Sequence, residues 1–114
     1  MSLRYIETVS VSASQVNHYK IVPFVYNVLN PTTATVIIDL STATSYEDEY
    51  VIEVNKTDIV NNSVTSIDWP STLVWEGDVE PDIDDFTTLG YDAWVVTIRN
   101  GKFASHKRYY KSTT

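Results

Sequence analysis

The sequence predicts a single all-β domain, either an antiparallel β-sandwich or a barrel-like fold, and three observations support this fold class. Val and Ile account for 24 of the 114 residues and eight Tyr add to this β-branched and aromatic set, while strong helix formers are sparse. Short segments of alternating polarity are separated by turn residues about every 8 to 12 positions, as in sandwiches and barrels. An Asn-Gly pair near the C-terminal end predicts a tight hairpin.

Period-two alternation of apolar and polar side chains predicts the individual strands. They cover residues 4–12, 19–29, 34–40, 49–54, 64–69, 91–99 and 102–110. Pro23 has no N–H for a sheet ladder and so marks an edge position or a bulge. We expect a polar connection over residues 55–63, a loop with a helical turn over residues 82–90, and a two-residue type I′ turn at Asn100-Gly101.

The segment from Ser66 to Pro81 holds two of the three Trp, and the rest of the chain is expected to support it. Trp69 and Trp75 lie six residues apart, which places them on one face of an extended chain. A Pro at position 70 predicts a corner between two short strands, and Gly77-Asp78 predicts a turn after the second. This segment is therefore expected to be a corner followed by a buried Trp anchor.

Length and composition limit the classes of protein to which the chain can belong. Its 114 residues form one domain, 1–114, with residues 1–3 and 111–114 expected to be frayed. No apolar run reaches the roughly 20 residues needed to cross a bilayer, which predicts no membrane insertion. A net charge of −7 argues against nucleic acid as a partner, because phosphate binding requires a basic face.

Charge is distributed unevenly along the chain. Between Lys56 and Arg99 there is no Lys or Arg but there are nine acids, while the stretch from Arg99 to Lys111 is basic and has no acid. One interpretation is a solvated acidic loop loosely paired with a basic terminal strand. The other is head-to-tail or inter-subunit charge matching, which would fix register more than it adds affinity.

No pattern predicts catalysis, so we expect no catalytic residue, no cofactor and no enzyme. The acidic loop gives no reason for one carboxylate to differ in pKa from the others, as acid–base catalysis requires. Calcium binding suits this loop better than catalysis does, but Ile83 stands where an EF-hand has Gly, which leaves a calcium site of another type as the alternative. His18 and His106 have no other ligand residue at metal spacing and are expected at the surface or in turns.

Aromatic residues offer the remaining candidate site. Six of them could form a sugar-stacking platform: Trp69, Trp75, Trp94, Tyr91, Tyr109 and Tyr110. Core or subunit-interface packing is the alternative that we prefer for the same set, because aromatic side chains dominate both environments. The residues singled out as partner-facing or sugar-facing are Trp69, Trp75, Trp94, Asp78 and Asp82.

Two segments resemble the trimeric tail-fibre and tail-associated domains of bacteriophages. The first, residues 34–44, contains an Asp-Leu-Ser-Thr run at the end of a strand; the second, residues 67–81, contains the series Trp-Pro, Trp, Gly, Pro. The resemblance continues through Gly90-Tyr91-Asp92 and Asn100-Gly101-Lys102, so that residues 34–110 are covered.

This resemblance implies a non-catalytic virion protein of the phage tail, with a structural or receptor-facing role and no cofactor. It implies an intertwined trimeric fibre domain made in the host cytoplasm. The implied partners are other copies of the chain, other virion proteins and a host-surface glycan. The alternative function is a monomeric carbohydrate-binding sandwich with an aromatic sugar-stacking face.

Overall fold

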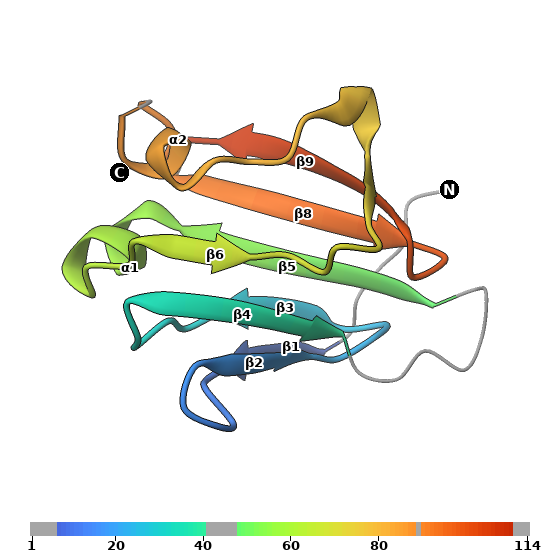
Figure 1. Cartoon of the computed structure of the whole chain (residues 1–114), viewed down its shortest axis with the longest axis horizontal. Helices are drawn as coiled ribbons and strands as arrows, with labels where there is room; N and C mark the ends of the chain where they lie inside the picture. Colours follow the sequence, from blue (N-terminus) through green and yellow to red (C-terminus); the bar gives the residue numbers. More distant parts are fainter. Residues whose placement is uncertain (1–6, 41–47, 89, 111–114) are drawn as a thin grey trace.

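The computed structural model describes residues 7–40, 48–88 and 90–110, and it is mostly β (Figure 1). The larger sheet contains, in spatial order, β1 (Thr8–Val11), β3 (Tyr26–Leu29), β5 (Glu49–Asn55), β8 (Ala93–Arg99), β9 (Phe103–Tyr109) and β7 (Val74–Trp75). The smaller sheet contains β2 (His18–Ile21), β4 (Thr35–Leu40) and β6 (Ser66–Asp68). The helical elements are α1 (Lys56–Asn61), the 3-10 turn η1 (Glu76–Asp78) and α2 (Ile83–Thr88).

The first six strands alternate between the two sheets, and within each sheet they run parallel. β1 pairs with β3 and β3 with β5, while β2 pairs with β4 and β4 with β6. In Figure 1 the smaller sheet lies in front of β1, β3 and β5. The antiparallel prediction is therefore wrong for this half of the chain. A parallel pair needs a crossover between its strands, and here that crossover is a strand of the other sheet.

In the second half, β5, β8 and β9 follow the predicted antiparallel pattern, whereas β7 pairs parallel with β9, against the prediction, so the large sheet is mixed. β5 pairs antiparallel with β8, and β8 pairs antiparallel with β9. Asn100 and Gly101 both have positive φ, and the Lys102 N–H donates to the Arg99 carbonyl at 3.0 Å, which confirms the turn. Pairing begins at Arg99 and Phe103, so the connection is one residue longer than predicted.

The predicted long strand over residues 19–29 is wrong, because two strands of different sheets occupy this stretch. The chain leaves β2, turns at Pro23-Phe24 and enters β3, with Phe24 at a φ of 63°. The fully buried Asn27 holds this turn. Its Oδ1 accepts from the Val22 N–H at 3.0 Å, and its Nδ2 donates to the carbonyls of Val22 and Val51, both at 2.9 Å.

Two short helices flank the β-sheets. The polar connection expected over residues 55–63 contains α1, which the sequence did not predict; its Ile59 is buried in the core. The helical turn expected near residues 84–88 is confirmed as α2, whose Phe86 is 1% exposed. None of the helices in the described part of the chain is long and apolar enough to span a membrane.

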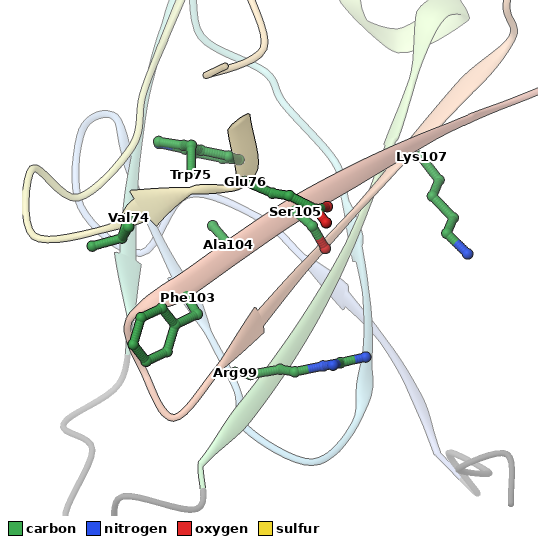
Figure 2. A pocket seen from close by; sticks show the side chains of 8 residues that line it. All are labelled: Val74, Trp75, Glu76, Arg99, Phe103, Ala104, Ser105 and Lys107. Atoms are coloured by element: carbon green, nitrogen blue, oxygen red, sulfur yellow. The ribbon is translucent and has the colours of Figure 1, made fainter. Parts of the chain in front are cut away.

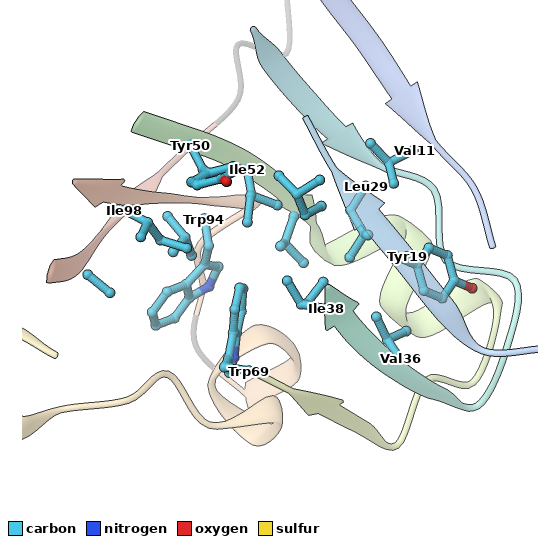
Figure 3. Close-up of a cluster of buried hydrophobic side chains, with 14 of the residues drawn as sticks. Val11, Tyr19, Leu29, Val36, Ile38, Tyr50, Ile52, Trp69, Trp94 and Ile98 are labelled. Carbon is cyan, nitrogen blue, oxygen red and sulfur yellow. The ribbon is translucent and has the colours of Figure 1, made fainter. Parts of the chain in front are cut away.

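The core lies between the two sheets, and Figure 3 shows part of it. Strand alternation fills it as predicted, because Tyr50, Ile52 and Val54 of β5 and Val36 of β4 are completely buried. Each such side chain stabilises the fold by about 1.5 to 3 kcal/mol relative to an exposed one. The termini predicted to fray, residues 1–3 and 111–114, and most of the predicted turn at 41–48 lie outside the described residues.

Candidate functional site

The segment from Trp69 to Asp82 runs from the edge of the small sheet to the edge of the large sheet. β6 ends at Asp68, Trp69-Pro70 makes the predicted corner, and β7 joins the large sheet beside β9. The predicted turn is confirmed, since Gly77 and Asp78 both have positive φ. The chain then returns to β6, where Glu80 to Ile83 line a shallow pocket with Ser66 and Ile67.

Aromatic rings connect this segment to the core. Trp69 and Trp75 meet edge to face with ring centroids 5.5 Å apart, and Trp75 lies 6.1 Å from the His106 ring. His106 in turn lies 5.0 Å from Trp94, which packs on Phe86 at 4.7 Å. The His106 Nε2 is 3.3 Å from the Val79 carbonyl oxygen, so this side chain fastens the acidic turn to β9.

The three predicted Trp residues differ in exposure, which decides which of them can meet a ligand. Trp94 is 1% exposed and Trp69 is 8% exposed, so their rings belong to the core and offer no face to a sugar. Trp75 is half-buried at the open edge of the sheet. The sequence placed all three in one candidate set, because period-two alternation does not tell the centre of a core from its rim.

Trp75 borders a groove of about 480 Å³ at the edge of the large sheet (Figure 2). The groove is lined by Val74, Trp75, Glu76, Arg99, Phe103, Ala104, Ser105 and Lys107. It forms because β7 pairs with β9 only at Val74 and Trp75, and the chain then turns away into η1. From Ser105 onward, β9 has no strand on this side among the described residues.

The groove combines apolar and charged side chains. Val74 and Phe103 are ladder partners and are 44% and 52% exposed, so together they form a continuous apolar patch. Arg99 is the ladder partner of Phe103 on the other side, and Lys107 lies further along β9 on the same face. Glu76 supplies the one carboxylate among the lining residues. The site can therefore take a partner that has both an apolar and an acidic part.

The predicted acidic residues occupy two kinds of position. Asp78 is exposed in the turn after β7. Asp82 is exposed just before α2, and its Oδ1 accepts from the Asp84 N–H at 3.1 Å. Asp82 is thus part of the start of a helix as well as of the acidic surface. The described residues contain no group of three or more His, Cys, Asp or Glu side chains that could hold a metal.

The histidines are not simple surface or turn residues. His18 begins β2 and its Nδ1 lies 2.8 Å from Asp39 Oδ2 on the neighbouring strand β4. His106 is half-buried and packs against Trp75 and Trp94. Neither arrangement was predictable from the sequence, since each depends on a partner from another strand.

A second polar group on the outer face of the large sheet was also missed. Tyr26 donates its hydroxyl proton to Glu53 Oε1 at 2.7 Å, and Asn55 Nδ2 donates to Glu53 Oε2 at 2.9 Å. Burial, and after it the hydrogen bond and charge of Glu53, raise the pKa of the Tyr26 hydroxyl. Tyr26 and Glu53 line a depression of about 370 Å³ together with Tyr109. Only the parallel pairing of β3 and β5 brings Tyr26 and Glu53 together.

Comparison of this chain with protein-family models, curated proteins and solved structures gives no match.

Proposed function

We propose that the chain is a non-catalytic structural domain of a bacteriophage tail, from a tail fibre or a tail-associated protein. In this proposal the domain acts as a homo-oligomer, with a trimer favoured, in contact with other virion proteins. Two lines of support come together here: the resemblance of residues 34–110 to such domains, and an exposed apolar patch at a sheet edge.

The observation that carries the proposal is the pair Val74 and Phe103 beside Trp75. Adjacent, strongly exposed apolar side chains in a chain of net charge −7 are typical of a surface that another protein covers. Aromatic side chains dominate the binding energy of such contacts. The location at a sheet edge also favours a protein partner, because edge strands are open to further contacts.

We also propose that the two sheets form a β-sandwich in the assembled protein. Both sheets contribute to one buried cluster, with Tyr19, Val36 and Ile38 from the small sheet and Tyr50, Ile52 and Trp94 from the large one. In a sandwich of this kind the apolar inner faces of the two sheets are buried against each other within one chain. Contacts between chains then use edges and outer faces, where the groove beside Trp75 lies.

One observation favours a second function, that of a carbohydrate-binding module. Half-buried Trp75 is one of the residues that line a groove, which also holds the polar side chains of Glu76, Arg99 and Ser105. A ring face with hydrogen-bonding groups beside it is the usual means of holding a sugar. A glycan array decides this alternative: binding that is lost in Trp75→Phe/Arg99→Ala would support it, and an array with no binder would remove it.

The mass of the protein in solution tests the structural proposal. We expect light scattering on a sizing column to give an oligomer at micromolar concentration, and Phe103→Ser to shift it towards the monomer. The matched control is Val60→Ser on α1, which removes an equally exposed apolar side chain, 53% against 52%. A wild-type protein that stays monomeric, or a Val60→Ser variant that dissociates as readily as Phe103→Ser, would contradict the proposal.

A further inference from the structure

The groove and the turn beside it carry opposite charges without an ion pair between them. Arg99 and Lys107 are exposed at the groove, and no described carboxylate forms a salt bridge with either. Asp78 and Glu80 are exposed in the turn that follows β7, and no described cation pairs with them. The acidic turn has no cation near it along the chain, since no Lys or Arg occurs between Lys56 and Arg99.

These charges stay apart within one chain because of how β7 ends. The backbone turns away from β9 at Glu76, with Gly77 and Asp78 in the left-handed region, and neither Asp78 nor Glu80 lines the groove. The His106 contact to the Val79 carbonyl holds the turn in this position. In Figure 1 the η1 turn stands out from the body beyond β9. Asp78 and Glu80 are both exposed, and Glu80 lies where the chain returns to β6.

The two surfaces also match in their order of apolar and charged groups. The turn presents Val79, which is 55% exposed and extended in backbone, between the carboxylates of Asp78 and Glu80. The groove presents the apolar pair Val74 and Phe103 with Arg99 and Lys107 close by. An apolar centre with charges around it is the usual arrangement of a specific protein contact.

We propose that the groove of one copy binds the acidic turn, Asp78-Val79-Glu80, of a second copy. Val79 covers Phe103 and Val74, while the two carboxylates face Arg99 and Lys107. This inference rests on the proposed self-association and names the surfaces that meet. The occupant is a second copy because the chain itself supplies the complementary segment, exposed and without an ion-pair partner among the described residues.

Charge reversal on each side tests the contact by sedimentation velocity. Arg99→Glu/Lys107→Glu makes the groove acidic, and Asp78→Asn/Glu80→Lys makes the turn basic. Asn is used at position 78 because the backbone φ there is 58°, which Asn tolerates well. Either change turns attraction into repulsion, so we expect association to weaken about tenfold or more. The variant with all four substitutions has an acidic groove and a basic turn, so association should return.

Lys20→Glu on β2 is the control for a change of net charge, since this exposed residue lies in the small sheet. It should associate like the wild type, and raising the salt concentration should weaken the wild-type contact. A wild-type oligomer that is unaffected by either pair of reversals would overturn this inference and leave the proposed function standing. Failure of the fourfold variant to reassociate while remaining folded by circular dichroism would also overturn it. A wild-type monomer would instead contradict the proposed self-association itself.

Discussion

Trp69 and Trp75 meet edge to face, with ring centroids 5.5 Å apart and planes at 79°, at the rim of the core. Trp69 comes from the corner after the small sheet, and Trp75 from the last strand of the large sheet. Their contact therefore joins the two sheets along one side of the molecule. The acidic turn and the groove both depend on this contact, because they follow or border Trp75 directly.

Replacing Trp75 with Ala should lower the free energy of unfolding by about 2 to 3 kcal/mol. A fully buried Trp typically costs about 3 to 5 kcal/mol when truncated, and Trp75 is only half-buried. Part of the loss comes from the edge-to-face contact with Trp69, because such an aromatic pair contributes about 0.5 to 1.5 kcal/mol in addition to the burial of its apolar surface. Urea unfolding measures the change. Val79→Ala, at an exposed site directly after η1, is the control and should change stability by less than about 0.5 kcal/mol.

Asn27→Ala should destabilise the protein strongly, by about 2 to 4 kcal/mol. The side chain is fully buried and bonds the backbone of Val22 and Val51, so its loss leaves buried polar groups without partners. Asn30→Ala is the matched control, because Asn30 is exposed and its side chain bonds only Ser12 Oγ, at 3.2 Å, within the described part of the chain. Thermal unfolding should show a large shift for the first variant and almost none for the second; equal shifts would contradict the role given to Asn27.

Gly77→Ala should cost about 1 to 2 kcal/mol, because Gly77 has a φ of 67° and an L-residue is strained there. The space around the new methyl group is not the problem, since its nearest neighbour beyond the two adjacent residues would be Val79 Cγ2 at 4.0 Å. Gly90→Ala separates the two causes: its φ is not positive, and its Cβ would meet Tyr110 at an ordinary 3.9 Å. Denaturant unfolding that shows the two variants to be equally stable would argue against strain at the turn.

Tyr26 should make stability fall at alkaline pH. Its pKa is raised in the folded state by burial and by Glu53, so folding favours the neutral hydroxyl. That contribution is fully present below the unfolded pKa of about 10 and is lost as the pH rises from there towards the folded pKa. In Tyr26→Phe the free energy of unfolding should therefore decline less steeply above pH 10. At neutral pH the same variant should be less stable by about 1.5 to 3 kcal/mol, because the hydrogen bond to the Glu53 carboxylate is lost. Unfolding curves from pH 7 to 11 measure both effects; an unchanged alkaline slope in the variant would count against the shift.

Local signals in the sequence predicted the elements that depend on neighbouring residues. Alternation located β4, β5 and β8, and the Asn100-Gly101 pair located the last hairpin. The Trp69-Pro70 corner and the turn at Gly77 were found in the same way. Each of these features is determined by backbone propensities over a few residues, which a sequence displays directly.

Strand partners could not be predicted, because alternation has the same period in parallel and antiparallel strands. Short connections suggested antiparallel neighbours, whereas Pro23-Phe24 carries the chain from one sheet to the other. α1 was missed because Thr57, Ile59 and Val60 are β-branched and weak helix formers. The charged groove could be predicted only in part. The sequence showed Arg99 and Lys107 as members of a basic stretch, but their position beside Trp75 depends on the parallel pairing of β7 and β9, which the sequence did not show.

The mass of the native particle tests the central claim most directly. Sedimentation equilibrium at micromolar concentration and low salt should give a multiple of the 12.9 kDa mass of one chain, with three copies favoured. A single species at 12.9 kDa over the whole concentration range would contradict an assembly role for the edge formed by Val74, Trp75 and Phe103.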